Sequence, residues 1–219
     1  MLALVVAIAV FLICHSLPTV PALRRPIEAA LGRAGFTLAY SALSLGLLTW
    51  VVVAARDAPV IVLWFQQPWM RWVPVLAMVP ASALIAAGLA TPNPFSIGPG
   101  GRHFDPARPG LLRLTRHPVL WGMALWAGAH LLPNGQLALL LLFVPLLGLA
   151  VAGPSLLDAK RRRTLGEAEW RRLAALTGRP AEWREVVAEM GWPRLAAGPP
   201  LYALLLAAHP LVIGYSPLP

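Results

Sequence analysis

The chain has 219 residues, of which 58% are hydrophobic and only 12% are charged, and its formal net charge is +9. Soluble domains carry roughly 25% charged residues, so this composition, with a mean hydropathy of +0.68, excludes a water-soluble globule and an intrinsically disordered chain. The single cysteine, Cys14, excludes a disulfide framework and cysteine-rich zinc sites.

Apolar stretches recur along the whole chain. A membrane-spanning helix needs about 20 apolar residues. The hydropathy pattern predicts about six spans, at residues 2–23, 36–54, 69–90, 118–133, 137–157 and 195–214. Pro133, Asn134 and Gly135 are a turn signal, which predicts that the fourth and fifth spans form an antiparallel hairpin. The expected fold is therefore an all-α, polytopic membrane helix bundle, with residues 1–219 as a single domain.

Positive charges are concentrated between alternate spans. Of the 18 lysines and arginines, all but Arg56 and Arg71 lie in the first, third and fifth predicted loops. Because loops rich in lysine and arginine stay in the cytoplasm, we expect a multi-pass protein of a bacterial inner (cytoplasmic) membrane with both termini on the periplasmic side. Contact with anionic lipid then accounts for the net charge, and nucleic acid is not expected as a partner.

Two segments outside the spans are predicted to lie at the membrane surface. Residues 58–65 are apolar but too short to cross a bilayer. A basic amphipathic cytoplasmic segment is expected at about 159–194. Within it, residues 165–190 predict one amphipathic helix, or a pair that is broken near Gly178-Arg179-Pro180.

The ionisable groups inside the predicted spans are histidines, not carboxylates. All nine aspartates and glutamates lie in loops or at helix ends, which argues against a di-iron carboxylate site and against a proton-coupled transporter. His15, His130 and His209 lie within the first, fourth and sixth spans, and His117 lies at the start of the fourth. An ionisable side chain inside a bilayer is a functional candidate because its burial is costly.

At about 1.5 Å of rise per residue, His15, His130 and His209 all fall near the midplane of a core about 30 Å thick. His117 is about 20 Å along the helix from His130 and on nearly the opposite face, so these two cannot share a metal ion. The pairs His15 with His130 and His130 with His209 both stay open. Neutral imidazoles from two facing helices suit a haem iron.

Two other interpretations of these histidines also stay open. A zinc ion is one, although the usual further ligands are missing. Hydrogen bonding between helices is the other, and it is worth about 1 kcal/mol. Trp126 lies one turn before His130. Small residues nearby predict room for a flat macrocycle or a close contact between helices: Gly122, Ala124, Gly128 and Ala129.

Four segments of the sequence resemble one known family. They are residues 11–17, 114–122, 125–135 and 209–219. At these positions the chain resembles the NnrU family of bacterial inner-membrane proteins. The most specific part is the block R-H-P-x-L-W-G followed by A-H-L-x-x-N-G, and the likeness runs from the first span to the last residue.

The resemblance implies a membrane protein that binds haem b. Plant and cyanobacterial relatives are 15-cis-zeta-carotene isomerases, in which two histidines hold haem b, and these ligand positions fall on His15 and His130. His117 matches a further histidine of the family, although its position and helix face argue against iron ligation. Together with Trp126 and His209, which were selected by their positions in the spans, it is a further candidate for contact with the cofactor. The implied partners are the lipid bilayer, an apolar polyene substrate and an electron donor. The plant enzymes have a cysteine where this chain has an alanine, at position 127, which argues against thiol-dependent ligand exchange.

Two other functions fit the same sequence. The family name comes from genes associated with denitrification and nitric oxide metabolism, so one alternative is a non-enzymatic haem sensor or accessory protein. The other is a membrane S-adenosylmethionine-dependent methyltransferase. The segments Arg116-His117-Pro118 and 166–170 of this chain resemble motifs of those enzymes. Against it, Asp158-Ala159-Lys160 replaces the expected pair of glutamates, and the histidines in the spans would have no role.

Overall fold

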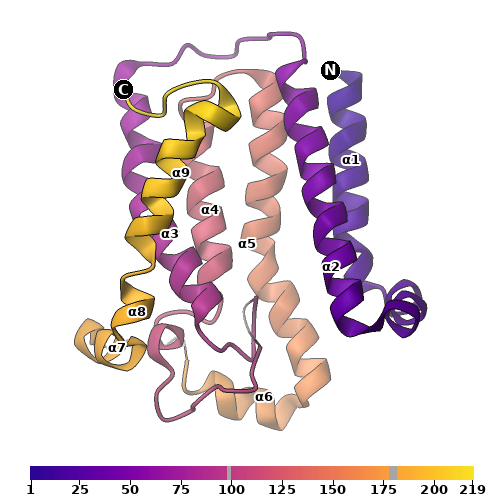
Figure 1. The fold of residues 1–219 in the computed structure, drawn as a ribbon, viewed down its shortest axis with the longest axis vertical. Helices are drawn as coiled ribbons and strands as arrows, with labels where there is room; N and C mark the ends of the chain where they lie inside the picture. The colour runs from indigo at the N-terminus through magenta and orange to yellow at the C-terminus, as the bar shows by residue number, and fades with distance from the viewer. Residues whose placement is uncertain (98–99, 178–181) are drawn as a thin grey trace. The chain divides into compact units, whose positions relative to one another are not determined.

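The computed structural model describes residues 1–97, 100–177 and 182–219, and within these residues the chain is helical with no β-strand (Figure 1). This confirms the predicted all-α class. The α-helices in chain order are α1 Leu2–Ser16, α2 Pro21–Arg56, α3 Trp72–Ala90, α4 Pro118–Leu131, α5 Leu137–Leu165, α6 Glu167–Ala174, α7 Trp183–Met190, α8 Trp192–Leu195 and α9 Gly198–Ile213. Short 3-10 turns occupy Leu17–Thr19, Pro68–Arg71 and Gly110–Arg113.

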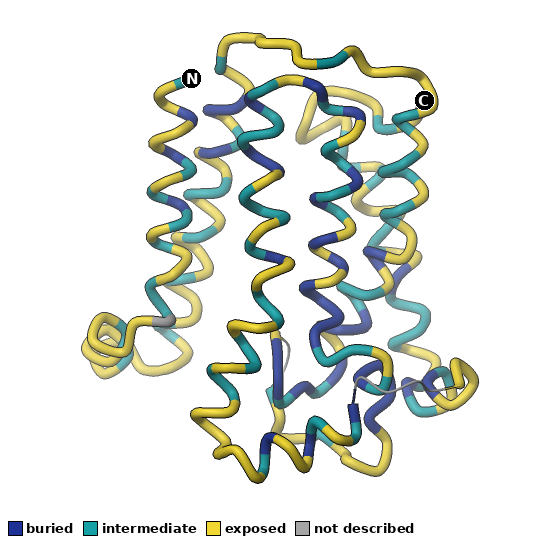
Figure 2. Tube along the Cα trace, turned by 180° about the vertical axis from the view of Figure 1, so that it is seen from behind, coloured by how far each residue is buried: buried dark blue, intermediate teal, exposed yellow. Residues whose placement is uncertain are grey.

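Four helical segments are long and apolar enough to cross a membrane: Pro21–Arg56, Pro68–Ala90, Leu137–Leu165 and Trp192–Ile213. At most 22% of the apolar window in each is buried, so most residues of these windows are half-buried or exposed (Figure 2). An apolar exterior of this kind is typical of a lipid-facing protein. The predicted count of about six spans is not confirmed, because α1 has only 15 residues and α4 only 14. The placement of the termini also stays a prediction.

The residues group into two units, which are described separately: Met1–Phe65 with Asn134–Leu142, and Gln66–Pro133 with Phe143–Pro219. In the first unit, α1 packs against α2. The predicted first span is wrong at its C-terminal end, since α1 stops at Ser16 and α2 starts at Pro21, whose fixed φ suits a first helical turn. The predicted first loop is helical too: Arg24 Nε donates to Glu28 across one turn at 2.8 Å, and Gly32, with φ +70°, kinks the helix.

The other predicted spans agree more closely with the structure. α3, α4 and α9 begin and end within a few residues of the prediction. α5 continues eight residues beyond the predicted end at 157, to Leu165. α6 and α7 confirm two short helices in the predicted amphipathic segment, whose cytoplasmic position on the membrane surface stays a prediction. The predicted break at Gly178-Arg179-Pro180 lies outside the described residues. Residues 58–65 form no helix, and their position at a membrane surface stays a prediction.

Glycine brings the helices of the second unit close together. A Cβ on Gly122 of α4 would come within 2.7 Å of Ile85 Cγ1 and 2.8 Å of the Ala81 carbonyl oxygen in α3. A Cβ on Gly198, where α9 begins, would come within 2.9 Å of Ala83 Cα, again in α3. Small residues allow two helix backbones to approach this closely, and the van der Waals packing that results drives helix association in membranes. Of the two uses expected for Gly122, the structure therefore supports the close contact between helices.

Candidate functional site

His130 lies near the C-terminal end of α4 with its ring fixed on several sides. Its Nδ1 is 2.7 Å from the carbonyl oxygen of Trp126, one turn earlier. Its ring stacks on the ring of Phe143 of α5, with 5.2 Å between the ring centroids. The ring centroid of Trp126 lies 5.9 Å from that of His130. Because a carbonyl oxygen only accepts hydrogen bonds, Nδ1 carries the proton and the lone pair of the neutral ring is on Nε2.

His209 of α9 repeats this arrangement in the same unit. Its Nδ1 donates to the carbonyl oxygen of Tyr215 at 2.8 Å, which again leaves the lone pair on Nε2. His209 and His130 belong to the same unit. Arg71 fixes the segment that follows α9, since its guanidinium donates to the carbonyl oxygens of Ser216, at 2.8 Å, and of Leu218.

His15 belongs to α1 in the other unit, where Tyr40 of α2 fixes its ring. The Tyr40 hydroxyl donates to the His15 carbonyl oxygen at 3.0 Å and lies 3.3 Å from His15 Nδ1. Since the phenol has a single hydrogen, Nδ1–H is the donor in the second contact, and the lone pair is on Nε2. Tyr40 was missed from the sequence because no local motif links residues 25 positions apart.

The structure therefore places the expected ligands in two units. His130, Trp126 and His209 belong to one unit and His15 to the other. In the part of the chain that the structure describes, no group of three or more His, Cys, Asp or Glu side chains is arranged to hold a metal ion. Each of the three expected histidines has its Nδ1 within hydrogen-bonding distance of an oxygen in its own unit.

His117 lies at the opposite end of α4, in a second polar cluster. Its Nε2 donates to Asp158 Oδ1 of α5 at 3.0 Å, and Arg116 Nη2 donates to Asp158 Oδ2 at 2.9 Å. The His117 side chain is 4% exposed. Burial lowers the pKa of His117, although the carboxylate of Asp158 opposes this shift. A neutral His117 therefore donates from Nε2 and has its lone pair on Nδ1.

The loop after α3 and the helix α6 complete this polar cluster. Asn93, which is fully buried, donates from Nδ2 to the Arg116 carbonyl oxygen at 2.9 Å. Its Oδ1 accepts from the backbone N–H of Ser96 at 3.1 Å. Trp170 of α6 lies below two guanidinium groups, with 5.6 Å from its ring centroid to Arg116 Cζ and 3.9 Å to Arg162 Cζ. Sequence reasoning missed Asp158, Asn93 and Trp170, because each reaches the cluster from a different element.

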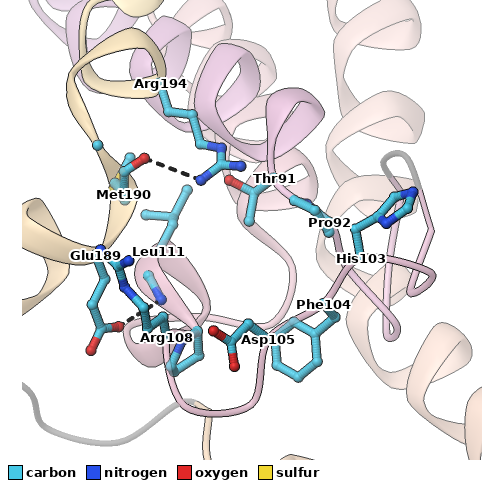
Figure 3. A pocket seen from close by; sticks show the side chains of 13 residues that line it. Thr91, Pro92, His103, Phe104, Asp105, Arg108, Leu111, Glu189, Met190 and Arg194 are labelled. Carbon is cyan, nitrogen blue, oxygen red and sulfur yellow. Dashed lines mark hydrogen bonds between the residues drawn. The ribbon is translucent and has the colours of Figure 1, made fainter.

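A pocket of about 320 Å³ lies beyond the C-terminal end of α3 (Figure 3). Its apolar lining residues include Leu111 and Met190, and its charged lining residues include Arg108, Asp105 and Arg194. Arg194 is fixed to the backbone, since it donates to the carbonyl oxygens of Met190 and of the last residue of α3 at 3.1 and 3.2 Å. This volume is at the lower end of the range for small-ligand sites, about 300–1,000 Å³.

An ion pair at one side of the pocket attaches α7 to the turn Gly110–Arg113. Glu189 accepts from Arg113 Nε at 2.9 Å and from the backbone N–H of Gly110 at 2.9 Å. Val186 and Met190 of α7 are buried beside this pair, against Leu111. The hydrogen bond from Arg113 is the main reason that the pKa of Glu189 is lowered, and the Gly110 N–H adds to the effect.

The attachment of α7 is therefore expected to fail at acidic pH. A carboxyl group with a lowered pKa stabilises the folded state above its ordinary pKa of about 4.3, and this stabilisation is lost as the pH falls through the lowered pKa. Hydrogen–deuterium exchange of residues 183–190 at decreasing pH should show faster exchange, while Glu189→Gln should exchange fast already at neutral pH. The same substitution at the exposed Glu182 is the control. Equal protection in Glu189→Gln and wild type would contradict this assignment.

Comparison with known proteins gives one match that covers almost the whole chain. A family model described as NnrU protein matches residues 3–217. Searches of curated proteins and of solved structures find no match.

Proposed function

Because the chain belongs to the NnrU family, which its residues 3–217 match, we propose that it is a membrane protein that binds haem b through His130 and a second histidine. The observation that carries this proposal is the hydrogen bond from His130 Nδ1 to the Trp126 carbonyl oxygen. A histidine ligand typically donates its other ring N–H to such an acceptor, which fixes the ring and makes the coordinating nitrogen more basic.

The second ligand is either His15 or His209. The family resemblance favours His15, and membership of the same unit as His130 favours His209. Both have the same protonation as His130, since Tyr40 and the Tyr215 carbonyl oxygen fix Nδ1–H in each. Histidine is one of the established axial ligands of haem iron, and both candidates would coordinate it as neutral imidazoles.

The resemblance to carotene isomerases extends the proposal to a reaction, the cis–trans isomerisation of an apolar polyene. Bound haem would supply the redox chemistry, while the protein sets the axial ligands and keeps the site apolar. Spans with outward apolar side chains suit a substrate that is dissolved in lipid. We place the protein in the bacterial inner membrane with its basic loops in the cytoplasm. A haem sensor for nitric oxide metabolism would use the same ligands.

Visible spectra of the detergent-purified protein test this proposal. We expect a low-spin b-type spectrum, in the oxidised form and after dithionite reduction, and a positive pyridine haemochrome assay. His130→Ala should lose the low-spin bands, and only one of His15→Ala and His209→Ala should do the same, which identifies the second ligand. The exposed His103 in the loop after α3 provides the control, His103→Ala.

A second set of outcomes separates the alternatives. Low-spin haem that survives in His130→Ala would overturn the ligand assignment. A protein that stays haem-free when haem is supplied would overturn haem binding, and binding of S-adenosylmethionine should then be measured. If haem is bound, conversion of a cis-carotene in liposomes would support the isomerase, and its absence together with nitric oxide binding would support the sensor.

A further inference from the structure

Unpartnered polar atoms gather around the polar cluster at the start of α4. Over the described ranges, five buried side-chain nitrogen or oxygen atoms have no hydrogen-bond partner. One of them, in Ser82, lies within α3. The other four belong to the cluster: Ser96 Oγ, Arg116 Nε, His117 Nδ1 and Trp170 Nε1. Native proteins leave few buried polar groups unsatisfied because each costs about 1–3 kcal/mol, so four in one cluster require an explanation.

These four residues are linked by a ring contact and through the shared partners Asp158 and Asn93. Arg116 and His117 are consecutive and share the carboxylate of Asp158. Trp170 lies beneath the Arg116 guanidinium, and Asn93 connects Ser96 to the Arg116 backbone through its amide. The side chain of His117 is 4% exposed and Trp170 is 7% exposed. Both are thus more than nine-tenths buried.

The chemistry of the unpartnered atoms selects a ligand class. Arg116 Nε and Trp170 Nε1 are N–H groups that can only donate. His117 donates from Nε2 to Asp158, so its Nδ1 accepts a hydrogen bond. A matching ligand needs oxygen acceptors and one hydroxyl donor. Two guanidinium groups, of Arg116 and Arg162, lie over the Trp170 ring, and the Asp158 carboxylate pairs with the first of them, so the surroundings favour a negative charge. The positive end of the α4 dipole adds to this preference.

We propose that Arg116, His117 and Trp170 form a binding site for a phosphate monoester or hydrogen phosphate. Its charged oxygens accept from Arg116 Nε and Trp170 Nε1, and its hydroxyl donates to His117 Nδ1. Asp158 positions the site, since it accepts from Arg116 Nη2 and His117 Nε2. The ligand comes from one of two sources, the headgroup of phosphatidic acid or a soluble phosphate compound. This site is independent of the proposed haem ligands.

Binding to the purified full-length protein tests the proposal. Isothermal titration with inorganic phosphate in detergent, and native mass spectrometry of nanodiscs with phosphatidic acid or phosphatidylcholine, distinguish the two sources. We expect Trp170→Phe, which keeps an aromatic ring but removes the N–H, to weaken binding roughly tenfold, as is usual for one lost hydrogen bond to a charged group. Trp192→Phe, at a tryptophan that is 78% exposed, should leave the affinity unchanged.

The selectivity of the wild-type protein provides a test that needs no variant. Sulfate has the charge and shape of phosphate but no hydroxyl at neutral pH, so it cannot donate to His117 Nδ1. We expect phosphate to bind at least tenfold more tightly than sulfate. Equal affinities would overturn the role of His117. No binding of phosphate or phosphatidic acid, or an unchanged affinity in Trp170→Phe, would overturn the site.

Discussion

Replacing Asp158 with alanine should lower the free energy of unfolding by roughly 3 kcal/mol, among the largest losses expected from a single side chain outside the proposed haem site. The Asp158 carboxylate is the acceptor for both Arg116 Nη2 and His117 Nε2, at 2.9 and 3.0 Å. Without it, a partly buried guanidinium loses its counter-charge and a buried imidazole loses its acceptor. Asp158→Asn keeps an oxygen for His117 but loses the charge, so its loss should be smaller.

Unfolding in mixed detergent with increasing SDS measures this effect. A matched control is Glu167→Ala, which removes an ion pair to Arg171 whose two side chains are 48% and 74% exposed. Exposed pairs contribute about 0–1 kcal/mol, so this control should stay close to wild type. Equal losses in Asp158→Ala and Glu167→Ala would mean that the cluster does not connect α4 to α5 energetically.

Gly122→Ala should destabilise the protein by about 1–3 kcal/mol, although it adds only one methyl group. The new Cβ would come within 2.8 Å of the Ala81 carbonyl oxygen, and a backbone atom cannot move aside as the end of a flexible side chain can. α3 and α4 must therefore separate, and the packing between them is lost. Unfolding by SDS again provides the measurement.

Gly148→Ala in α5 is the control for the intrinsic effect of glycine in a helix. A Cβ at Gly148 would meet nothing within 4 Å. Because alanine is the better helix former, this substitution should be neutral or stabilising by up to about 1 kcal/mol. A destabilisation of similar size at both positions would show that close contact between α3 and α4 is not what requires glycine at 122.

The sequence predicted the helices whose ends carry a local signal. α4 begins at Pro118 and α5 begins just after the Pro133-Asn134-Gly135 turn, as expected. The prediction failed where residues form a helix although their hydropathy is too low for a membrane span. Residues 24–35 are polar enough to read as a loop, yet the ion pair between Arg24 and Glu28 and the positive φ of Gly32 allow a kinked helix there.

The candidate sites also contain residues that could be predicted from the sequence and residues that could not. His15, His130 and His209 could be selected from the sequence because ionisable residues are rare in apolar spans. The atoms that fix their rings could not, since two of the three acceptors are backbone carbonyl oxygens and the third is the hydroxyl of Tyr40. The role of Asp158 could not be predicted from the sequence either. It reads as an ordinary helix-end carboxylate until α5 is seen to continue beyond it to Leu165.

The segment after α9 has a consequence for sequence variation. Its contacts with His209 and Arg71 are made by the carbonyl oxygens of Tyr215, Ser216 and Leu218, not by their side chains. Homologous proteins can therefore differ in side chain at Tyr215 and Leu218 and still orient the imidazole of His209, whereas Ser216 also accepts from the Leu218 N–H through its Oγ at 3.2 Å. An insertion or deletion between 210 and 218 would shift which carbonyl faces each donor, so the length of this segment is under stronger constraint than its composition.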